Sequence, residues 1–363
     1  MASAADERKD SPIKLCLTGD SGVGKSGAIV PLILAGYKVR AIDVDNGEDI
    51  VLDCLRNPDS PYFALASKLD LADVFRYETV NHKMITLDLG KDEVRIQPSA
   101  AIVWPRIEKL LHEWKEDSGV KLGSITSWGP DTVLVIDSST FAGYAAFAYV
   151  QQINNHLGQT SGNSWRRDIG GAQEHLESML RLLYSSAVKC HVIVITHINY
   201  LNESWQESEG GTRTRVVSSS ADGIFGSDRA YPSSIGRALG PKFGRYFNNV
   251  VEMRIEGTGA NVRRVIHTTP QGAVNVKTSS PFSLRRTYDV STGLAEIFAT
   301  LRHQEQPKAL LQALAKPKLV PTIGASATVP PRTFKPLAKP EPTQAPAPAT
   351  VLGSELENLG ANQ

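Results

Sequence analysis

A glycine-rich stretch near the start of the chain constrains the fold more than any other feature. Residues 19–26 read Gly-Asp-Ser-Gly-Val-Gly-Lys-Ser and directly follow an apolar run. The spacing fits G-x-x-x-x-G-K-[ST], the pattern of a P-loop, which joins a strand to a helix and cradles phosphate with backbone N–H groups. We expect Lys25 to reach the β- and γ-phosphates and Ser26 to ligate Mg²⁺. The expected phosphate-binding residues are Gly19, Asp20, Ser21, Gly22, Val23, Gly24, Lys25, Ser26 and Gly27.

Four apolar runs indicate buried parallel strands. They are rich in Val, Ile and Leu without strict alternation, which is typical of strands covered on both faces. They span residues 13–18, 37–45, 131–139 and 190–198.

Helical periodicity lies between these runs. Apolar side chains recur on one face at residues 105–116 and 170–187. Pro31 stands inside the helix expected after the P-loop and should kink it or shift its first turn. Residues 249–257 and 261–269 flank a short turn and predict an antiparallel hairpin. Strands alternating with helices predict an α/β fold with a mostly parallel, doubly wound sheet and a C-terminal antiparallel hairpin.

Composition narrows the protein class. The net charge of +1 gives no global basic field, so any contact with nucleic acid must come from local patches. The three cysteines are far apart in sequence and suggest neither a zinc site nor a disulfide framework. The polar start is unlike a signal peptide, and no run reaches the roughly 18 apolar residues of a membrane span. We therefore expect a cytoplasmic protein, of a microbe or of an infected host cell, with no membrane partner.

The composition also predicts how the chain is divided. Residues 1–12 resemble a short flexible tail, and residues 13–304 carry the strand and helix signals of one large α/β domain. Within it, residues 56–104 are less regular and suggest an insertion. Residues 305–363 are rich in Pro, Ala and Lys and predict a disordered tail. Its acidic, half-apolar end is either a solvated terminus or a peptide that docks on a partner.

Acidic residues follow two of the predicted strands. Asp137 ends a buried apolar run, where a carboxylate needs a cation partner, and a Mg²⁺ beside the P-loop would supply one. Asp43, Asp45 and Glu48 crowd the end of the run at 37–45. A carboxylate at this edge could orient and deprotonate the water that attacks a γ-phosphate, with Asp45 the first choice and Glu48 the second. The alternative is a set of turn-forming acids on Asp-Asn-Gly.

Polar residues after the last apolar run suggest a phosphate sensor. Thr196, His197 and Asn199 emerge at the carboxyl end of a strand, where ligands bind in such sheets. His197 is the candidate that reports loss of the γ-phosphate, although a structural histidine is the alternative.

Basic residues offer DNA contacts and an arginine finger. Residues 202–248 form a long segment that is rich in Gly and Ser and weakly periodic, as functional or disordered loops are. Trp165 offers a stacking face beside one basic pair, unless it is a buried anchor. The candidate DNA contacts are Arg166, Arg167, Arg213, Arg215 and Lys242, and the candidate fingers for a neighbouring subunit are Arg237, Lys242 and Arg245, with Arg245 preferred.

The ordered set of these motifs resembles a known family. Four segments occur in the order found in RecA-like phage ATPases. They are the P-loop with its following strand, SWGPDTVLVIDSST, GGAQEHLESMLRLLYSSAVKCHVIVITHI and IGRALGPKFGRYFNNVVEMRI. This AAA-type P-loop group includes single-strand-annealing recombinases, and the resemblance covers about residues 13–300. It implies a RecA-like P-loop NTPase core that uses ATP with Mg²⁺. It also implies a homo-oligomeric ring or filament on single-stranded DNA and cooperation with a single-strand-binding protein.

The resemblance also assigns roles by position. Lys25 and Ser26 match the Walker-A residues, and Asp137 matches the Walker-B acid. Asp45 falls where a catalytic glutamate is usual, and His197 where a glutamine sensor is usual. A shorter carboxylate would stand farther from the water, so these departures suggest slow hydrolysis.

Three functions remain open at this stage. The first is a DNA-stimulated ATPase of phage recombination, annealing or repair. The second is a nucleotide-switched accessory protein for replication or packaging, similar to a helicase loader, with little turnover. The third is a small-molecule kinase, which the acids and polar groups at the strand ends favour least, because they suit water attack and sensing better.

Overall fold

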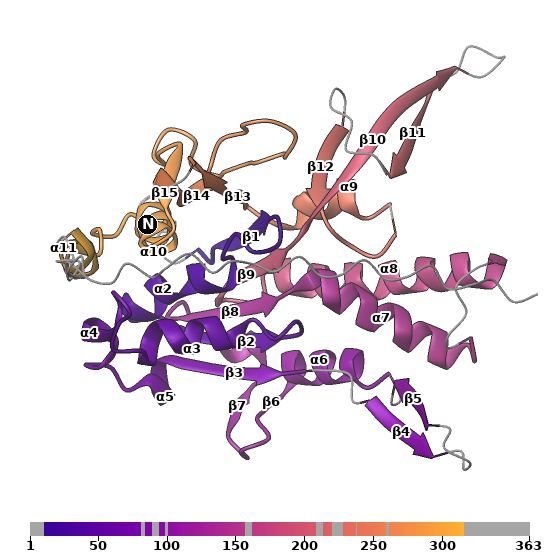
Figure 1. Ribbon diagram of the computed structural model, residues 1–363, viewed down its shortest axis with the longest axis horizontal. Coiled ribbons are helices and arrows are strands. Elements are labelled where there is room, and N and C mark those ends of the chain that lie inside the picture. The colour runs from indigo at the N-terminus through magenta and orange to yellow at the C-terminus, as the bar shows by residue number, and fades with distance from the viewer. Residues whose placement is uncertain are drawn as a thin grey trace, which may run out of the picture. The chain divides into compact units, whose positions relative to one another are not determined.

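An eight-stranded sheet forms the centre of the protein (Figure 1). The structure is a computed structural model that describes residues 11–80, 84–88, 94–98, 101–156, 162–207, 213–219, 228–236, 238–258 and 261–315. In spatial order the strands are β15 (Thr287–Asp289), β14 (Arg263–His267), β13 (Asn249–Glu256), β1 (Lys14–Gly19), β9 (His191–Thr196), β8 (Thr132–Asp137), β2 (Lys38–Asp43) and β3 (Phe75–Thr79).

The sheet is parallel from β13 to β3, and only β13–β14 and β14–β15 pair antiparallel. The predicted mostly parallel sheet and C-terminal antiparallel hairpin are therefore confirmed. The order has one consequence for function: β9 lies between β1, which leads into the P-loop, and β8, which ends at Asp137. All three strands deliver their carboxyl ends to the same edge of the sheet.

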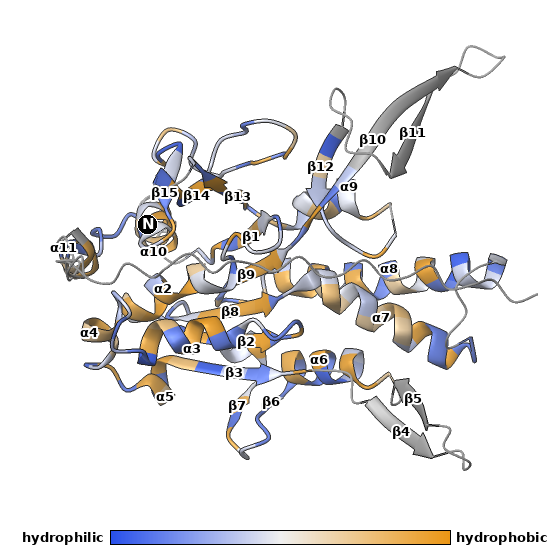
Figure 2. Cartoon of the chain, viewed as in Figure 1, coloured by the Kyte–Doolittle hydropathy of each residue, from blue (hydrophilic) through white to orange (hydrophobic). Residues whose placement is uncertain are grey.

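Helices cover both faces of the sheet, as the predicted doubly wound fold requires. Along β8, Leu134 and Ile136 pack into one core with helices α6 (Val103–His112), α7 (Ser139–Ile153) and α8 (Gly162–Tyr184). Val133 and Val135 point the other way, into a second core. That core is covered by α2 (Val30–Leu34), α3 (Glu48–Arg56) and α10 (Gly293–Leu301). Figure 2 shows the hydrophobic colour of β8 and β9 between these layers.

The predicted helices exist, but with different ends. The one expected at 105–116 is α6, and it stops at His112 because Glu113 takes an extended conformation. Trp114, whose spacing indicated a further helical turn, instead packs from β6 against Trp128, with ring centroids 5.5 Å apart. The helix expected at 170–187 is α8, which begins at Gly162. The helix runs through Gly171, where a Cβ would lie 3.1 Å from Val150 of α7, so the glycine permits close packing of the two helices.

The segment 56–104, predicted as an insertion, belongs partly to the core. It contributes β3, which pairs with β2 as an edge strand of the main sheet. The polar pattern of β3 hid this role in the sequence, because an edge strand is less buried than its neighbours. The other elements here are α4 (Phe63–Ala66), α5 (Leu71–Val74) and a hairpin of β4 (Met84–Asp88) with β5 (Val94–Pro98).

The composition of residues 202–248 indicated one long loop, but the structure shows strands and short helices there. In its first part, β10 (Ile198–Glu207) lies between β11 (Arg213–Ser219) and β12 (Asp228–Pro232) in an antiparallel sheet. Figure 1 shows the β10–β11 hairpin projecting from the body of the protein. The remaining short elements are η1 (Ser26–Ile29), β6 (Trp114–Lys115), β7 (Lys121–Gly123), η2 (Ile125–Ser127), α9 (Gly240–Phe243) and η3 (Gly244–Tyr246).

The first part of the segment predicted as a tail, residues 305–363, lies within the described structure. Residues 308–315 form helix α11 (Lys308–Ala315), whose Leu310 is buried in the second core. Alanine and leucine favour helix, and the partly buried Leu314 packs against the same core as Leu310. The N-terminal tail up to residue 10 and the Pro-rich stretch from residue 316 lie outside the described residues.

We predict that Leu310→Ala lowers the free energy of unfolding by about 2–3 kcal/mol, because it removes a buried leucine from the core. Urea denaturation followed by circular dichroism would measure the change. The matched control is Leu311→Ala on the same helix, which is less buried and should cost under about 1 kcal/mol. Equal effects of the two substitutions would contradict the packing of α11.

Candidate nucleotide-binding site

The P-loop lies at the carboxyl end of β1. Two of its glycines are required by their surroundings: a Cβ on Gly19 would lie 2.6 Å from the Met253 carbonyl oxygen, and Gly24 has a φ of +93°. The loop leads into η1, and a new helix, α2, starts with Pro31 in its first turn. The predicted shift at Pro31 is confirmed.

The Lys25 ammonium is buried and bound to its own loop. It donates to the carbonyl oxygens of Gly19 at 3.0 Å and Asp20 at 2.7 Å, and it lies 3.4 Å from His197 Nδ1. Burial lowers the pKa of Lys25, while the charges of Asp137 and Asp45 oppose that shift. The lysine therefore stands between the phosphate loop and the acidic edge.

Ser26 and Asp137 form a small oxygen-lined cradle. The Ser26 hydroxyl is hydrogen-bonded to the Asp137 carboxylate. A Cβ added to Gly47 would lie 2.6 Å from Ser26 Oγ and 2.9 Å from Asp137 Oδ2, so both oxygens border the space that only glycine leaves open. Hydroxyl and carboxylate oxygens are ligands that Mg²⁺ prefers, and Mg²⁺ usually completes its shell with water and substrate phosphates. The donors therefore fit the ion expected from the sequence.

The acidic side chains near this cradle give it an excess of negative charge. Burial, followed by the nearby charge of Asp45, raises the pKa of Asp137 to about 7. In the part of the chain that the structure describes, no three His, Cys, Asp or Glu side chains gather as a metal site.

The Asp-Asn-Gly turn contains both a turn-forming acid and a site acid. Asp43 is buried, and its Oδ1 accepts the N–H groups of Asp45 at 3.2 Å and Gly47 at 3.0 Å. Burial raises the pKa of Asp43 to about 6, and the hydrogen bonds from the turn oppose that rise. Asn46 has a φ of 64°, which an asparagine in a turn tolerates. Asp43 thus holds the turn, while Asp45 is left to face the lysine.

His197 joins the two sides of the site. It lies between β9 and β10, where its Nε2 is 3.7 Å from Asp45 Oδ2 and its Nδ1 faces Lys25. The backbone N–H of His197 donates to Thr140 Oγ1 at 3.1 Å. The imidazole ring contacts Phe141, with ring centroids 6.1 Å apart. The structure therefore brings four of the candidate residues, Lys25, Asp45, Asp137 and His197, together.

Three neighbouring candidates lie less centrally. Glu48 is the first residue of α3 and is buried; its Oε2 is among the side-chain atoms without a hydrogen-bond partner in the described part of the chain. Thr196 is buried and donates to the His197 carbonyl oxygen at 2.6 Å. Asn199 belongs to β10, opposite Tyr231. Of the carboxylates after β2, Asp45 is the one in contact with the histidine.

The basic candidates are dispersed. Arg166 and Arg167 are exposed on α8, next to Trp165, which packs edge-on against Phe147. Arg213 and Arg215 lie on β11, opposite Glu207 and Trp205 in register. Arg237 lies outside the described residues.

The preferred finger lies toward the opposite edge of the sheet. Arg245 and Lys242 are exposed, and three residues after Arg245 the Asn248 N–H donates to the Lys14 carbonyl oxygen. Lys14 begins β1, whereas Gly19 ends it. Arg245 is therefore near the amino end of the strand that carries the P-loop at its other end.

Sequence reasoning missed two residues of the site. Gly47 was noticed only as part of a turn, although its missing Cβ opens the cradle. Arg264 lies in the predicted hairpin, and its Cδ is 3.1 Å from the position of a Cβ on Gly24. The doubled arginine at 263–264 was a visible signal, but nothing local places it beside the P-loop.

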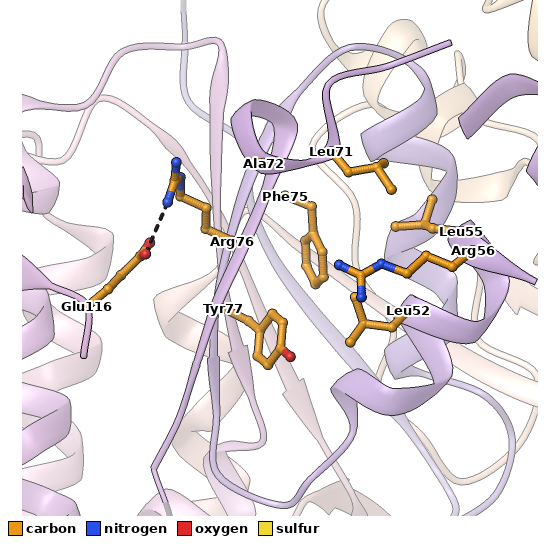
Figure 3. A pocket seen from close by; sticks show the side chains of 9 residues that line it. All are labelled: Leu52, Leu55, Arg56, Leu71, Ala72, Phe75, Arg76, Tyr77 and Glu116. Atoms are coloured by element: carbon orange, nitrogen blue, oxygen red, sulfur yellow. Dashed lines mark hydrogen bonds and ion pairs between the residues drawn. The ribbon is translucent and has the colours of Figure 1, made fainter. Parts of the chain in front are cut away.

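A separate cavity of about 250 Å³ lies beside the edge strand β3. Figure 3 shows Phe75 and Tyr77 next to the apolar side chains of α3, and Arg76 bound to Glu116. It is lined by Leu52, Leu55, Arg56, Leu71, Ala72, Phe75, Arg76, Tyr77 and Glu116. None of the P-loop residues lines it.

Comparison with known proteins gives no family. No protein-family model and no curated protein matches the chain. Among solved structures, the flagellar accessory protein FlaH from Methanocaldococcus jannaschii is similar at 9% identity, over 78% of this chain and 88% of its own, with a TM-score of 0.31. A KaiC-like protein from Pyrococcus horikoshii OT3 is similar at 12% identity, over 76% and 84%, also with a TM-score of 0.31. Likeness this weak carries no argument about function. None of the helices described here is long and apolar enough to span a membrane.

We predict that Asp137→Asn stabilises the ligand-free protein at alkaline pH. The folded pKa of about 7 exceeds the ordinary 3.8, so the folded state binds more protons than the unfolded chain between about pH 4 and pH 7. The wild type therefore loses stability as pH rises through that window, whereas the amide does not ionise. Without Mg²⁺ or nucleotide, the variant should melt about 3–6 °C higher at pH 8 and equally at pH 4.

The control for this experiment is Asp131→Asn. Asp131 precedes the same strand, but it is paired with Lys38 at 3.1 Å, and the pKa of Asp131 is lowered by that partner. Its replacement should bring no gain at pH 8. A lower melting temperature for Asp137→Asn at pH 8 would contradict the buried, unfavourable charge.

Proposed function

We propose that the protein binds Mg-ATP at the P-loop and hydrolyses it. The observation that carries the proposal is the convergence of Lys25, Asp137 and Asp45 with His197 at the carboxyl ends of β1, β2, β8 and β9. Backbone N–H groups of the loop would hold the phosphates. This set contains a phosphate-binding cation, a Mg²⁺ cradle and a carboxylate at the place where a γ-phosphate would end.

Each residue has a distinct task in this proposal. Bound Mg²⁺ would neutralise charge on the β- and γ-phosphates. Ser26 and Asp137 would hold the ion, and Lys25 would leave the loop carbonyls to bind the phosphates. Asp45 would orient the attacking water and accept its proton. His197, held by the Thr140 hydroxyl and facing both Lys25 and Asp45, would hydrogen-bond the γ-phosphate and respond to its loss.

We further propose that this is a RecA-like phage ATPase acting on single-stranded DNA in recombination, annealing or repair. In support, β10 begins directly after His197, so the projecting hairpin that carries Arg213 and Arg215 is covalently joined to the phosphate contact. A homo-oligomer on DNA, a single-strand-binding protein as partner of the C-terminal segment, and a cytoplasmic location belong to the same proposal. The alternative function is a nucleotide switch with little turnover, and the tests below distinguish it from the DNA-stimulated ATPase.

We expect wild-type protein to hydrolyse ATP several-fold faster with single-stranded DNA, and Lys25→Ala to lose both the basal and the stimulated rate. Phosphate release with and without an oligonucleotide would measure this. Lys38→Ala is the control, because that lysine is half-exposed on β2 and paired with Asp131. Nucleotide binding without turnover or DNA binding would contradict the recombination proposal and leave the switch.

We expect Asp45→Asn to lower kcat about 100-fold or more, because it removes the proposed base, with the Kd for ATP changed less than about threefold. Glu48→Gln tests the rival acid and should reduce kcat far less. The exposed neighbour Asp49→Asn serves as the control and should leave both constants unchanged. A larger kcat loss for Glu48→Gln than for Asp45→Asn would reverse the assignment.

A further inference from the structure

Arg264 rests on the phosphate loop from the side opposite the acids. It lies on β14 across from Ile255, where β13 extends beyond the level of Gly19. The Arg264 Cδ and Nε lie 3.1 and 3.3 Å from the position of a Cβ on Gly24. Any side chain at Gly24 would therefore displace the arginine, in addition to meeting the unfavourable φ of +93°.

Among the described residues, the Arg264 guanidinium differs from its neighbours in having no acidic partner. Arg263 is paired with Glu256 at 2.9 Å, and Arg254 with Glu252 at 2.5 Å. No ion pair of Arg264 occurs in the part of the chain that the structure describes. An exposed, unneutralised cation against an anion-binding loop is suited to take an anion, and guanidinium groups bind phosphate oxygens in bidentate fashion.

The strand order indicates which phosphates are within its reach. β1 has β9 on one side, toward Asp137 and Asp45, and β13 on the other, toward Arg264. Ser26 and Asp137 would hold Mg²⁺ on the β9 side, where the ion would neutralise charge on the terminal phosphates. The part of the nucleotide nearer the nucleoside must then run toward β13 and β14.

We propose that Arg264 is a nucleotide-binding residue that contacts the α- and β-phosphates and so retains ADP as well as ATP. This inference rests on the proposed nucleotide function and adds a residue to that site. Arg264 acts on binding, because it stands on the far side of the loop from the carboxylate that would handle the water.

The test measures dissociation constants of fluorescent mant-ADP and mant-ATP for the full chain. Arg264→Ala should raise both by about tenfold, in equal measure, because the contact lies on phosphates that both nucleotides carry. Arg264→Lys should recover part of the loss, since a lysine keeps the charge without the bidentate geometry. Arg263→Ala is the matched control and should change neither constant by more than about twofold.

Competition by inorganic tripolyphosphate separates phosphate contact from base contact. Arg264→Ala should weaken this competitor about as much as the nucleotides. A change under twofold in all three ligands, a loss for ATP alone, or a loss confined to the ligands that carry a base would each overturn the assignment. If wild type and Lys25→Ala bind mant-ATP equally poorly, the proposed function fails, and this inference fails with it. If Lys25→Ala weakens binding but Arg264→Ala does not, the inference alone is rejected.

Discussion

The carboxylates of Asp43 and Asp137 lie at the same level of the sheet, because β2 and β8 are parallel and these last residues are register partners. Both side chains are buried, and burial raises the pKa of each. Two acids brought together in this way need compensation. The N–H groups of the Asp-Asn-Gly turn compensate the Asp43 carboxylate. This arrangement also directs Asp45 toward Lys25 and His197. Among the described residues, the Ser26 hydroxyl and the charge of Lys25 compensate Asp137, but the pKa of Asp137 stays raised, as suits a site for a divalent cation.

The sequence predicted this edge because its signals are local. The P-loop glycines, the apolar strand before Asp137 and the polar residues after β9 each lie within one short segment, and a parallel sheet gathers such strand ends by geometry alone. The side chains that the structure joins around Lys25 were all candidates beforehand. The choice between Asp45 and Glu48 was less clear, since spacing could not show that the turn directs Asp45 to the histidine while Glu48 starts a helix.

Features that depend on distant partners were not predictable in the same way. The polar strand β3 reads as irregular until its pairing with β2 is known. The use of glycine at position 171 of α8 is explained only by the close approach of Val150 of α7. The proximity of Arg264 to Gly24 joins residues 240 positions apart in sequence. A doubled arginine in a hairpin is ordinary solvated surface in most proteins, and only the strand order places one member against the P-loop.

The strand order also bears on Arg245. That residue lies near the amino end of the β1–β13 pair, while the P-loop occupies the carboxyl end, so one copy presents the two at opposite edges. In the proposed homo-oligomer, Arg245 can therefore act as a finger only on the nucleotide of another copy. A head-to-tail contact between unlike surfaces would bring these edges together, and such heterologous contacts generate rings when the rotation closes and filaments when it does not. Arg264 has no such requirement, because it reaches the loop within its own chain.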